Sequence, residues 1–156
     1  MNTNEQLMSR FYTAFQRLDY KTMQDCYHKD AIFSDPVFGL LDAPQVKAMW
    51  EMLCKRAKDF TLEFLEVKSE DEYGTCKWIA KYTFSQTGRR VVNDVKAFMK
   101  FADGKIIEHS DGFSIWKWNR QALGWKGWLL GWTNFMQNRI HRNARKNLDE
   151  YMNRNK

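Results

Sequence analysis

The chain has 156 residues and a formal net charge of +6 at pH 7. This length suits a single domain that can bury a core without disulfides or metals. Residues 138–156 hold six Lys or Arg against two acidic residues, a charge of +4, so the rest of the chain carries only +2. We therefore expect no nucleic-acid-binding surface, in which basic and aromatic residues would alternate along a strand platform.

The cysteines and the lengths of the apolar runs indicate where in the cell the protein is expected. Cys26, Cys54 and Cys76 are an odd number at wide spacings, and two of them lie in apolar patterns. We expect reduced thiols in the core. The first ten residues lack the apolar stretch of a signal peptide, and no apolar run is long enough to span a bilayer. A cytoplasmic protein is expected.

Three helices are predicted in the first third of the chain. Thr3 and Gln6 resemble a capping box, and so do Asp42 and Gln45. Asp19 can cap a short helix between these two. The second helix would carry Met23 and Tyr27, and the third an apolar stripe of Val46, Met49, Trp50, Leu53 and Cys54.

A short apolar run separates the second and third helices. Residues 31–35 alternate as in a strand, so Asp35 should lie on the same inward face as Phe33. A carboxylate there needs partners, a raised pKa or a chemical role. The alternative is that Asp35 only caps the turn that Pro36 begins.

From residue 60 the hydrophobic period changes to two, which predicts strands. The parity shifts at Leu65 and Val67, as expected of a bulge. Helices followed by antiparallel strands predict an α+β domain in which helices cover one side of a curved sheet. Turns are predicted at Thr87-Gly88 and Asp103-Gly104, and a last strand from Lys105 to about Trp118 with Ile107, His109, Asp111, Phe113 and Ile115 on one face.

The end of the chain differs in composition. We expect residues 1–118 to form the domain and residues 119–156 to form a Trp-rich, basic helical extension that is not an independent domain. The extension would either cover the domain or a dimer interface, or lie on an anionic membrane surface. Packing is favoured, because an exposed apolar patch of that size promotes aggregation. Its apolar residues include Trp125, Trp128, Trp132, Phe135, Met136, Ile140, Ala144, Leu148 and Met152.

Two stretches of the sequence resemble one superfamily. HKDAIFSDPVFG at 28–39 and FADGKIIEHSDGF at 101–113, in this order of helices and strands, resemble the nuclear transport factor 2 superfamily and its SnoaL-like domains. The resemblance covers about residues 3–118. It implies a cone-shaped, curved antiparallel sheet covered by N-terminal helices, here with an added C-terminal helix, and a homodimer.

The segment around Asp35 is most similar to that of ketosteroid isomerase. There the Asp before Pro is the general base, beside an oxyanion hole made by a Tyr and a protonated Asp. Those two partners correspond to Phe11 and Ala97 in this sequence. Because an enolising base without oxyanion donors loses much of its catalysis, steroid isomerisation is disfavoured.

The SnoaL-like polyketide cyclases are the nearer comparison, because their last strand carries an acid after a His, similar to His109-Ser110-Asp111. The resemblance implies that Asp35 or Asp111 acts as an acid or base, with His109 orienting one of them, in a cofactor-free isomerisation, cyclisation or hydration. Alternatively, Asp111-Gly112 forms a hairpin and His109 is a structural residue. The rival function is a non-catalytic binding or interaction module.

The cone-shaped fold implies an apolar cavity for a small hydrophobic molecule. We expect no metal or other cofactor, since His28, His109 and His141 are isolated and no phosphate-binding glycine loop is present. Residues expected to bind the ligand, although each alone also fits a core, are Tyr12, Phe33, Trp50, Trp78, Tyr82, Phe84, Ala97, Met99 and Phe113.

Overall fold

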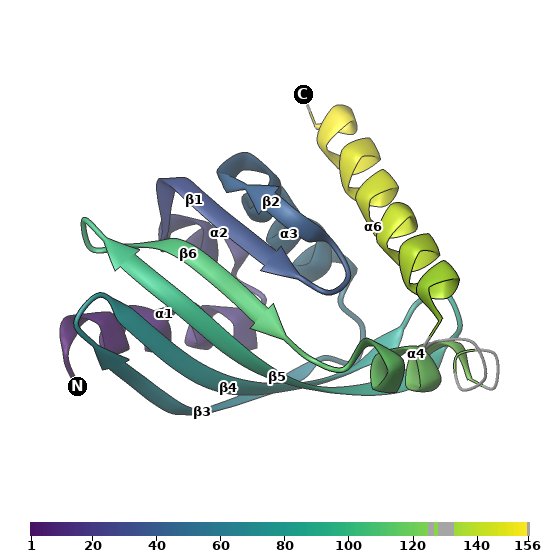
Figure 1. The fold of residues 1–156 in the computed structure, drawn as a ribbon, viewed down its shortest axis with the longest axis horizontal. Coiled ribbons are helices and arrows are strands. Elements are labelled where there is room, and N and C mark those ends of the chain that lie inside the picture. The colour runs from purple at the N-terminus through teal and green to yellow at the C-terminus, as the bar shows by residue number, and fades with distance from the viewer. Residues whose placement is uncertain (125–126, 128–132, 156) are drawn as a thin grey trace.

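The computed structural model describes residues 1–124, 127 and 133–155. Strands form one curved, open sheet with the N-terminal helices against its inner side, as the predicted α+β class requires (Figure 1). The helices are α1 (Thr3–Gln16), α2 (Tyr20–Asp25), α3 (Ala43–Arg56), α4 (Ile115–Leu123) and α6 (Asn134–Arg154). The strands are β1 (Tyr27–Asp35), β2 (Gly39–Asp42), β3 (Thr61–Glu70), β4 (Tyr73–Phe84), β5 (Arg89–Ala102) and β6 (Lys105–Gly112).

The sheet brings the first and the last strand of the domain side by side. Its strand order is β2-β1-β6-β5-β4-β3, and β1 and β6 are the parallel pair, while the other neighbours are antiparallel. Phe33 pairs with His109, and Ser34 pairs with Ser110. Asp35 and Asp111 each follow one residue later. The fold therefore places the two acids at the ends of neighbouring strands, although they lie far apart in the sequence.

The helix caps lie close to their predicted positions. The side chain of Asn2 caps α1 in a capping box with Glu5, one residue earlier than the predicted pair. Asp42 and Gln45 form the predicted capping box of α3. Leu53 was expected in the stripe of α3 but is 37% exposed, and Met52 is buried instead.

Two features of the first strands differ from the prediction. Tyr27 begins β1 instead of ending α2, and its side chain is buried. The segment after Pro36 was expected to be a turn alone, but Gly39 opens a further strand, β2, which pairs back onto β1. The resulting β1–β2 turn, residues 36–38, borders the candidate site described below.

Bulges decide which residues face inward. The predicted bulge in β3 lies between Leu65 and Lys68. A second one was not predicted: β5–β6 pairing passes from Lys100–Glu108 to Phe101–Ile106. Ile107 is the extra residue, so Ile106 is fully buried in place of Ile107. His109 and Asp111, beyond the bulge, keep the predicted inward direction.

The predicted extension of the last strand to Trp118 is wrong. β6 ends at Gly112, and Ser114 caps α4 by accepting a hydrogen bond from the backbone N–H of Lys117. The carboxamide of Gln121 then bonds both backbone groups of Val92, at 2.8 and 3.0 Å. Helix α4 thus supplies hydrogen-bond partners for the backbone of β5 beyond the end of β6. Ile115 lies in this helix, not on the sheet.

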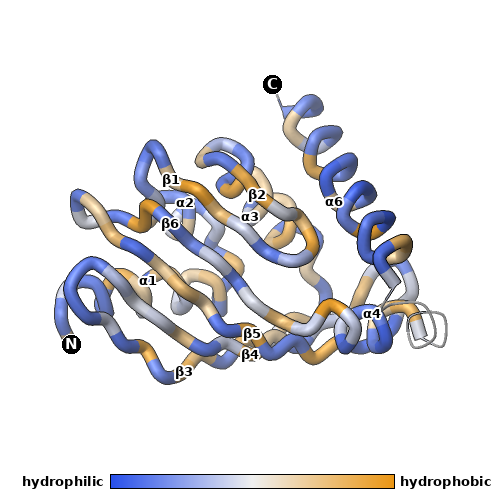
Figure 2. The backbone as a smooth tube through the Cα atoms, viewed as in Figure 1, coloured by the Kyte–Doolittle hydropathy of each residue, from blue (hydrophilic) through white to orange (hydrophobic). Residues whose placement is uncertain are grey.

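The predicted C-terminal helix is α6, and it packs against the domain. It is largely hydrophilic, with apolar residues spaced along one side (Figure 2). Leu148 is fully buried, and the Tyr151 hydroxyl donates to the Glu51 carboxylate of α3 at 2.6 Å. Trp125, Trp128 and Trp132 lie outside the described residues. In the part of the chain that the structure describes, no helix is long and apolar enough to cross a membrane.

Candidate functional site

Asp35 is held by the turn that follows it. Its Oδ1 accepts hydrogen bonds from the backbone N–H groups of Val37 at 2.9 Å and Phe38 at 2.6 Å. The expectation that Asp35 caps its own turn therefore holds. The same carboxyl group also lines the cavity described below, so the turn fixes its position without removing it from the site.

The surroundings of Asp35 favour its neutral form. Burial and the nearby Asp111 together raise the pKa of this carboxyl from 3.8 to about 7, against the opposing influence of the backbone hydrogen bonds and His109. Desolvation is the largest of these influences. Near neutral pH Asp35 is therefore present in both protonation states.

Asp111 and His109 form a buried pair on β6. Nε2 of His109 lies 2.9 Å from Oδ1 of Asp111, and both residues are at most 5% exposed. The Trp78 indole donates to the same oxygen at 3.4 Å. Ala97 is the register partner of Asp111 on β5, and its small side chain leaves room for this arrangement. The hairpin at Asp111-Gly112 does not form.

Two further side chains extend this pair into a chain of hydrogen bonds. The Trp50 indole donates to the Tyr27 hydroxyl at 2.8 Å, and that hydroxyl lies 2.7 Å from Nδ1 of His109. The indole N–H is only a donor, and the Tyr27 oxygen that accepts it still has its own proton to donate, for which Nδ1 is the acceptor within reach. In this assignment of the protons, His109 carries its proton on Nε2 and donates it to Asp111. In this series of hydrogen bonds every donor points the same way, from Trp50 toward Asp111.

The Tyr27 proton stays on its oxygen, since burial raises the pKa of this phenol well above its usual value. The imidazole is enclosed as well. Phe33 and Phe11 meet it edge-on, with ring centroids 5.0 and 5.7 Å away. Phe11 is thus a packing partner of His109.

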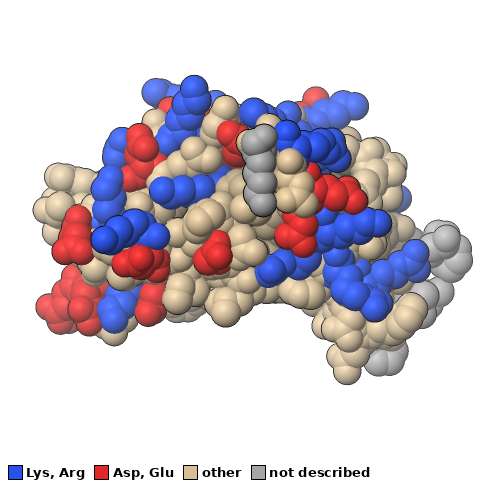
Figure 3. Space-filling view, turned by 90° about the horizontal axis from the view of Figure 1, so that it is seen from above, with Lys and Arg blue, Asp and Glu red and all other residues tan. Residues whose placement is uncertain are grey.

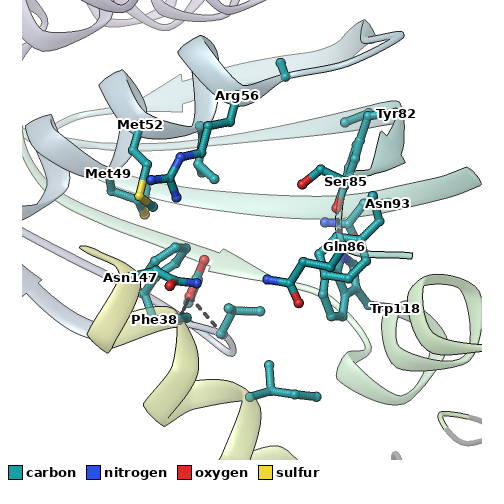
Figure 4. Close-up of a pocket in the computed structure, with 18 of the residues that line it drawn as sticks. Phe38, Met49, Met52, Arg56, Tyr82, Ser85, Gln86, Asn93, Trp118 and Asn147 are labelled. Carbon is teal, nitrogen blue, oxygen red and sulfur yellow. Dashed lines mark hydrogen bonds between the residues drawn. The ribbon is translucent and has the colours of Figure 1, made fainter. Parts of the chain in front are cut away.

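A cavity of about 750 Å³ lies between α3, α6 and the inner face of the sheet. Met49, Met52 and Arg56 reach it from α3, and Asn147 reaches it from α6 (Figure 4). Gln86 points in from the opposite side (Figure 4). Both Asp35 and Asp111 line this cavity, so the two acids open onto one largely apolar space of a size typical for small-molecule sites.

The nine residues expected to bind a ligand divide into two groups. Five of them line the cavity, namely Trp50, Trp78, Tyr82, Phe84 and Phe113. The other four are buried away from its described wall, namely Tyr12, Phe33, Ala97 and Met99. The Tyr12 hydroxyl is buried and has no hydrogen-bond partner among the described residues. Within the same part of the chain, no three metal-binding side chains are grouped as a site.

Sequence reasoning missed several residues of the site. Tyr27 was assigned to a helix, and no clear signal corrected this, because Lys29 is polar and exposed and the pairing of β1 is irregular between Tyr27 and Ile32. Arg56 and Asn147 were not considered, because a cation or an amide at a helix surface is ordinarily solvated. Only the docking of α6 beside α3 brings these two side chains to one cavity.

Comparison with known proteins identifies the family. Residues 8–109 match the SnoaL-like domain, so the chain belongs to this family. No curated protein sequence is significantly similar to the chain.

Solved structures share the fold at low identity. One is an NTF2-like protein of unknown function from Burkholderia pseudomallei, with a TM-score of 0.69 and 18% identity over 78% of this chain and 98% of that one. Another is an LEH-like epoxide hydrolase from M. tuberculosis, with a TM-score of 0.66 and 15% identity over 81% and 92%. A third, from Catenulispora acidiphila, has a ketosteroid isomerase-like fold and was solved with trimethylamine, at a TM-score of 0.65 and 8% identity over 74% and 91%.

Proposed function

We propose that the protein binds a small, mainly apolar molecule in this cavity and catalyses a cofactor-free proton transfer on it. The observation that carries the proposal is that two carboxyl groups, Asp35 and Asp111, line one apolar cavity, and that the pKa of one of them lies at about 7. A general acid or base works best when its pKa lies near the working pH. Isomerisation, aldol-type cyclisation and hydration are the reactions that such a group can serve.

The two acids have different surroundings and therefore different proposed roles. Asp35 is the group that takes or gives the proton, because desolvation brings its pKa to about 7. Asp111 accepts hydrogen bonds from His109 and Trp78, which hold its carboxyl group in place. Asp111 would orient the substrate or the attacking water, and His109 is a positioning residue.

A non-catalytic binding protein is the second candidate. It is favoured by Phe11 and Ala97, neither of which offers a side-chain donor to a developing oxyanion. Under this alternative the cavity binds its ligand and releases it unchanged.

Proton exchange on a simple ketone separates the two candidates. β-Tetralone in D₂O loses its α-proton NMR signals as they exchange, and we expect the wild-type protein to accelerate this loss. Asp35→Asn should slow the protein-dependent rate by about a hundredfold or more. The wild-type rate should rise with pH through about 7. Equal rates for wild type and Asp35→Asn would reject the catalytic role and leave ligand binding alone.

The assembly and location are further parts of the proposal. A homodimer is supported by apolar side chains that are exposed on the outer face of the sheet, where Phe98 is 49% exposed and Val92 is 43% exposed. A cytoplasmic location is supported by three cysteines that are all free and buried. The burial of Leu148 supports an extension that packs on the domain and does not fold alone, and it disfavours a membrane-surface role for α6.

A further inference from the structure

Arg56 is a cation at the cavity without an acidic partner. It is the last residue of α3, and it lines the cavity. Among the described residues it makes no ion pair and donates no hydrogen bond. Of the two acids nearest in sequence, Asp59 accepts a hydrogen bond from the Thr83 hydroxyl at 2.9 Å, and Glu51 is occupied by the Tyr151 hydroxyl at 2.6 Å and by Lys55 at 4.0 Å. The five N–H donors of Arg56 therefore remain available to a ligand.

The position of this guanidinium is nevertheless restricted. Its Cζ lies 5.7 Å from the centre of the Tyr151 ring, a cation–π contact. Tyr151 is fixed in turn by its bond to Glu51. A guanidinium held by an aromatic face is partly pre-organised, so a ligand that binds it loses less side-chain entropy than one that must order a free arginine.

Amide groups accompany the arginine on the facing helix. Asn143 and Asn147 are four residues apart on α6, so they share one face, and both line the cavity. In Figure 4, Arg56 reaches toward the cavity from α3 and Asn147 reaches toward it from α6 below. Carboxamides can donate to carboxylate oxygens, so the α3 and α6 walls together offer donors for an oxyanion.

The arginine and the acids act as separate charges. Backbone N–H groups hold Asp35, and His109 and Trp78 hold Asp111. Among the described residues Arg56 makes no ion pair with either acid, so it is not their counter-ion. A ligand with an anionic end would be attracted by Arg56 and disfavoured beside the two acids, so its orientation in the cavity would be fixed.

The surface around the cavity favours the approach of an anion. Lys and Arg side chains cover much of the surface around α6 (Figure 3). Helix α6 holds Arg139, Arg142, Arg145, Lys146 and Arg154 against Asp149 and Glu150. A local excess of positive charge raises the rate at which anionic ligands reach a site.

We propose that the cavity takes an amphipathic carboxylic acid, whose apolar body lies against the aromatic wall and whose carboxylate binds Arg56 and the amides of Asn143 and Asn147. This inference rests on the proposed use of the cavity for an apolar ligand, and it adds the chemical class of that ligand. The reacting carbon would then be the part of the molecule that lies near Asp35.

Two fluorescent probes test the carboxylate site. Anilinonaphthalenesulfonate carries an anionic group that stands in for the carboxylate, and phenylnaphthylamine has the same rings without the charge. We expect Arg56→Gln to weaken binding of the sulfonate by about fivefold and to leave the neutral probe unchanged. Lys58→Gln is the matched control. It removes the same charge two residues further along the chain, from an exposed side chain that does not line the cavity.

The outcomes separate this inference from the proposed function. Equal losses for both probes in Arg56→Gln, no loss for either, or an equal effect of Lys58→Gln would overturn the carboxylate site while leaving the cavity as a ligand site. Absence of binding of both probes to the wild-type protein would overturn both proposals. Ala144→Trp fills the cavity from α6 and should weaken both probes; sulfonate binding that survives it lies elsewhere and also contradicts the inference.

Discussion

The hydroxyl of Tyr27 lies 2.7 Å from Nδ1 of His109, across 82 residues of sequence. This contact fixes which imidazole nitrogen carries the proton, and it therefore decides what His109 can offer Asp111. Tyr27 also accepts the indole proton of Trp50, so one hydroxyl satisfies two buried groups.

Replacement of Tyr27 by Phe removes both contacts. We expect Tyr27→Phe to lower the free energy of unfolding by about 1–3 kcal/mol, because a buried indole N–H loses its acceptor. The imidazole nitrogen NMR shifts of His109 should also show a mixture of tautomers. Tyr73→Phe, at a 55% exposed site, is the control for urea denaturation. A single unchanged tautomer in Tyr27→Phe would contradict the proposed direction of the hydrogen bonds.

The raised pKa of Asp35 makes stability depend on pH. The folded protein keeps this proton up to about pH 7, whereas the unfolded chain releases it near pH 3.8. Between these values the folded state binds more protons, so its free energy of unfolding falls as the pH rises. The Asp35→Asn variant has no carboxyl group to titrate here, so its free energy of unfolding does not fall in this way. Its side-chain oxygen can still accept the two backbone hydrogen bonds. Its Tm relative to wild type should therefore increase from pH 4 to pH 8.

Thermal unfolding at several pH values measures this difference. Asp94→Asn, at an exposed position on β5, is the matched control and should keep a constant offset from wild type. A constant offset for Asp35→Asn as well would mean that Asp35 titrates in the folded protein as it does in the unfolded chain.

Replacing two native glycines by alanine tests the contact between the β1–β2 turn and α6. Gly39 and Gly88 have φ values of +70° and +71°, so alanine is strained at both. At Gly39 an added Cβ would also lie 2.6 Å from Cε1 of His141, whereas at Gly88 nothing lies within 4 Å. We expect Gly39→Ala to be about 1–3 kcal/mol more destabilising than Gly88→Ala in urea denaturation. Equal effects would show that α6 does not rest on this turn.

The proposed dimer has its own test. Light scattering coupled to size exclusion should give the mass of a dimer for the wild-type protein. Phe98→Lys places a charge on the exposed outer face of the sheet and should yield monomers. Phe135→Lys, at a 69% exposed site on α6, should remain dimeric. A monomeric wild-type protein would show the dimer proposal to be wrong.

Much of the fold follows from local signals in the sequence. The capping box of Asp42 and Gln45 marks the start of α3, and the alternation through Phe33 to Asp35 gives the inward direction of the acid. These signals depend on residues a few positions apart, so sequence periodicity detects them. The family resemblance added the curved sheet and its helices.

Other features depend on contacts that no local pattern encodes. The bulge at Ile107 reverses the parity of β6 without changing its composition. The helix at Ser114 satisfies an exposed edge of β5, a need that becomes visible only in the folded sheet. The contact of Tyr27 with His109, and the cavity that Arg56 and Asn147 both line, involve residues from distant segments. For this reason the two acids, His109 and the aromatic wall residues could be predicted from the sequence, whereas the roles of Tyr27, Arg56 and Asn147 could not.

The side chains of His141 and Arg145 have a consequence for how specificity could change in this protein. His141 donates to the carbonyl of Val37 at 3.0 Å, and Arg145 donates to that of Leu40 at 2.7 Å. The turn that positions Asp35 is thus braced by a helix outside residues 8–109, the part that matches the family. The cavity wall therefore comes from both parts of the chain: Asp35 and Arg56 lie inside the matched stretch, whereas Asp111, Asn143 and Asn147 lie beyond it. Under the proposed function, substitutions along α6 would alter which molecule is admitted while Asp35 on the sheet stays unchanged.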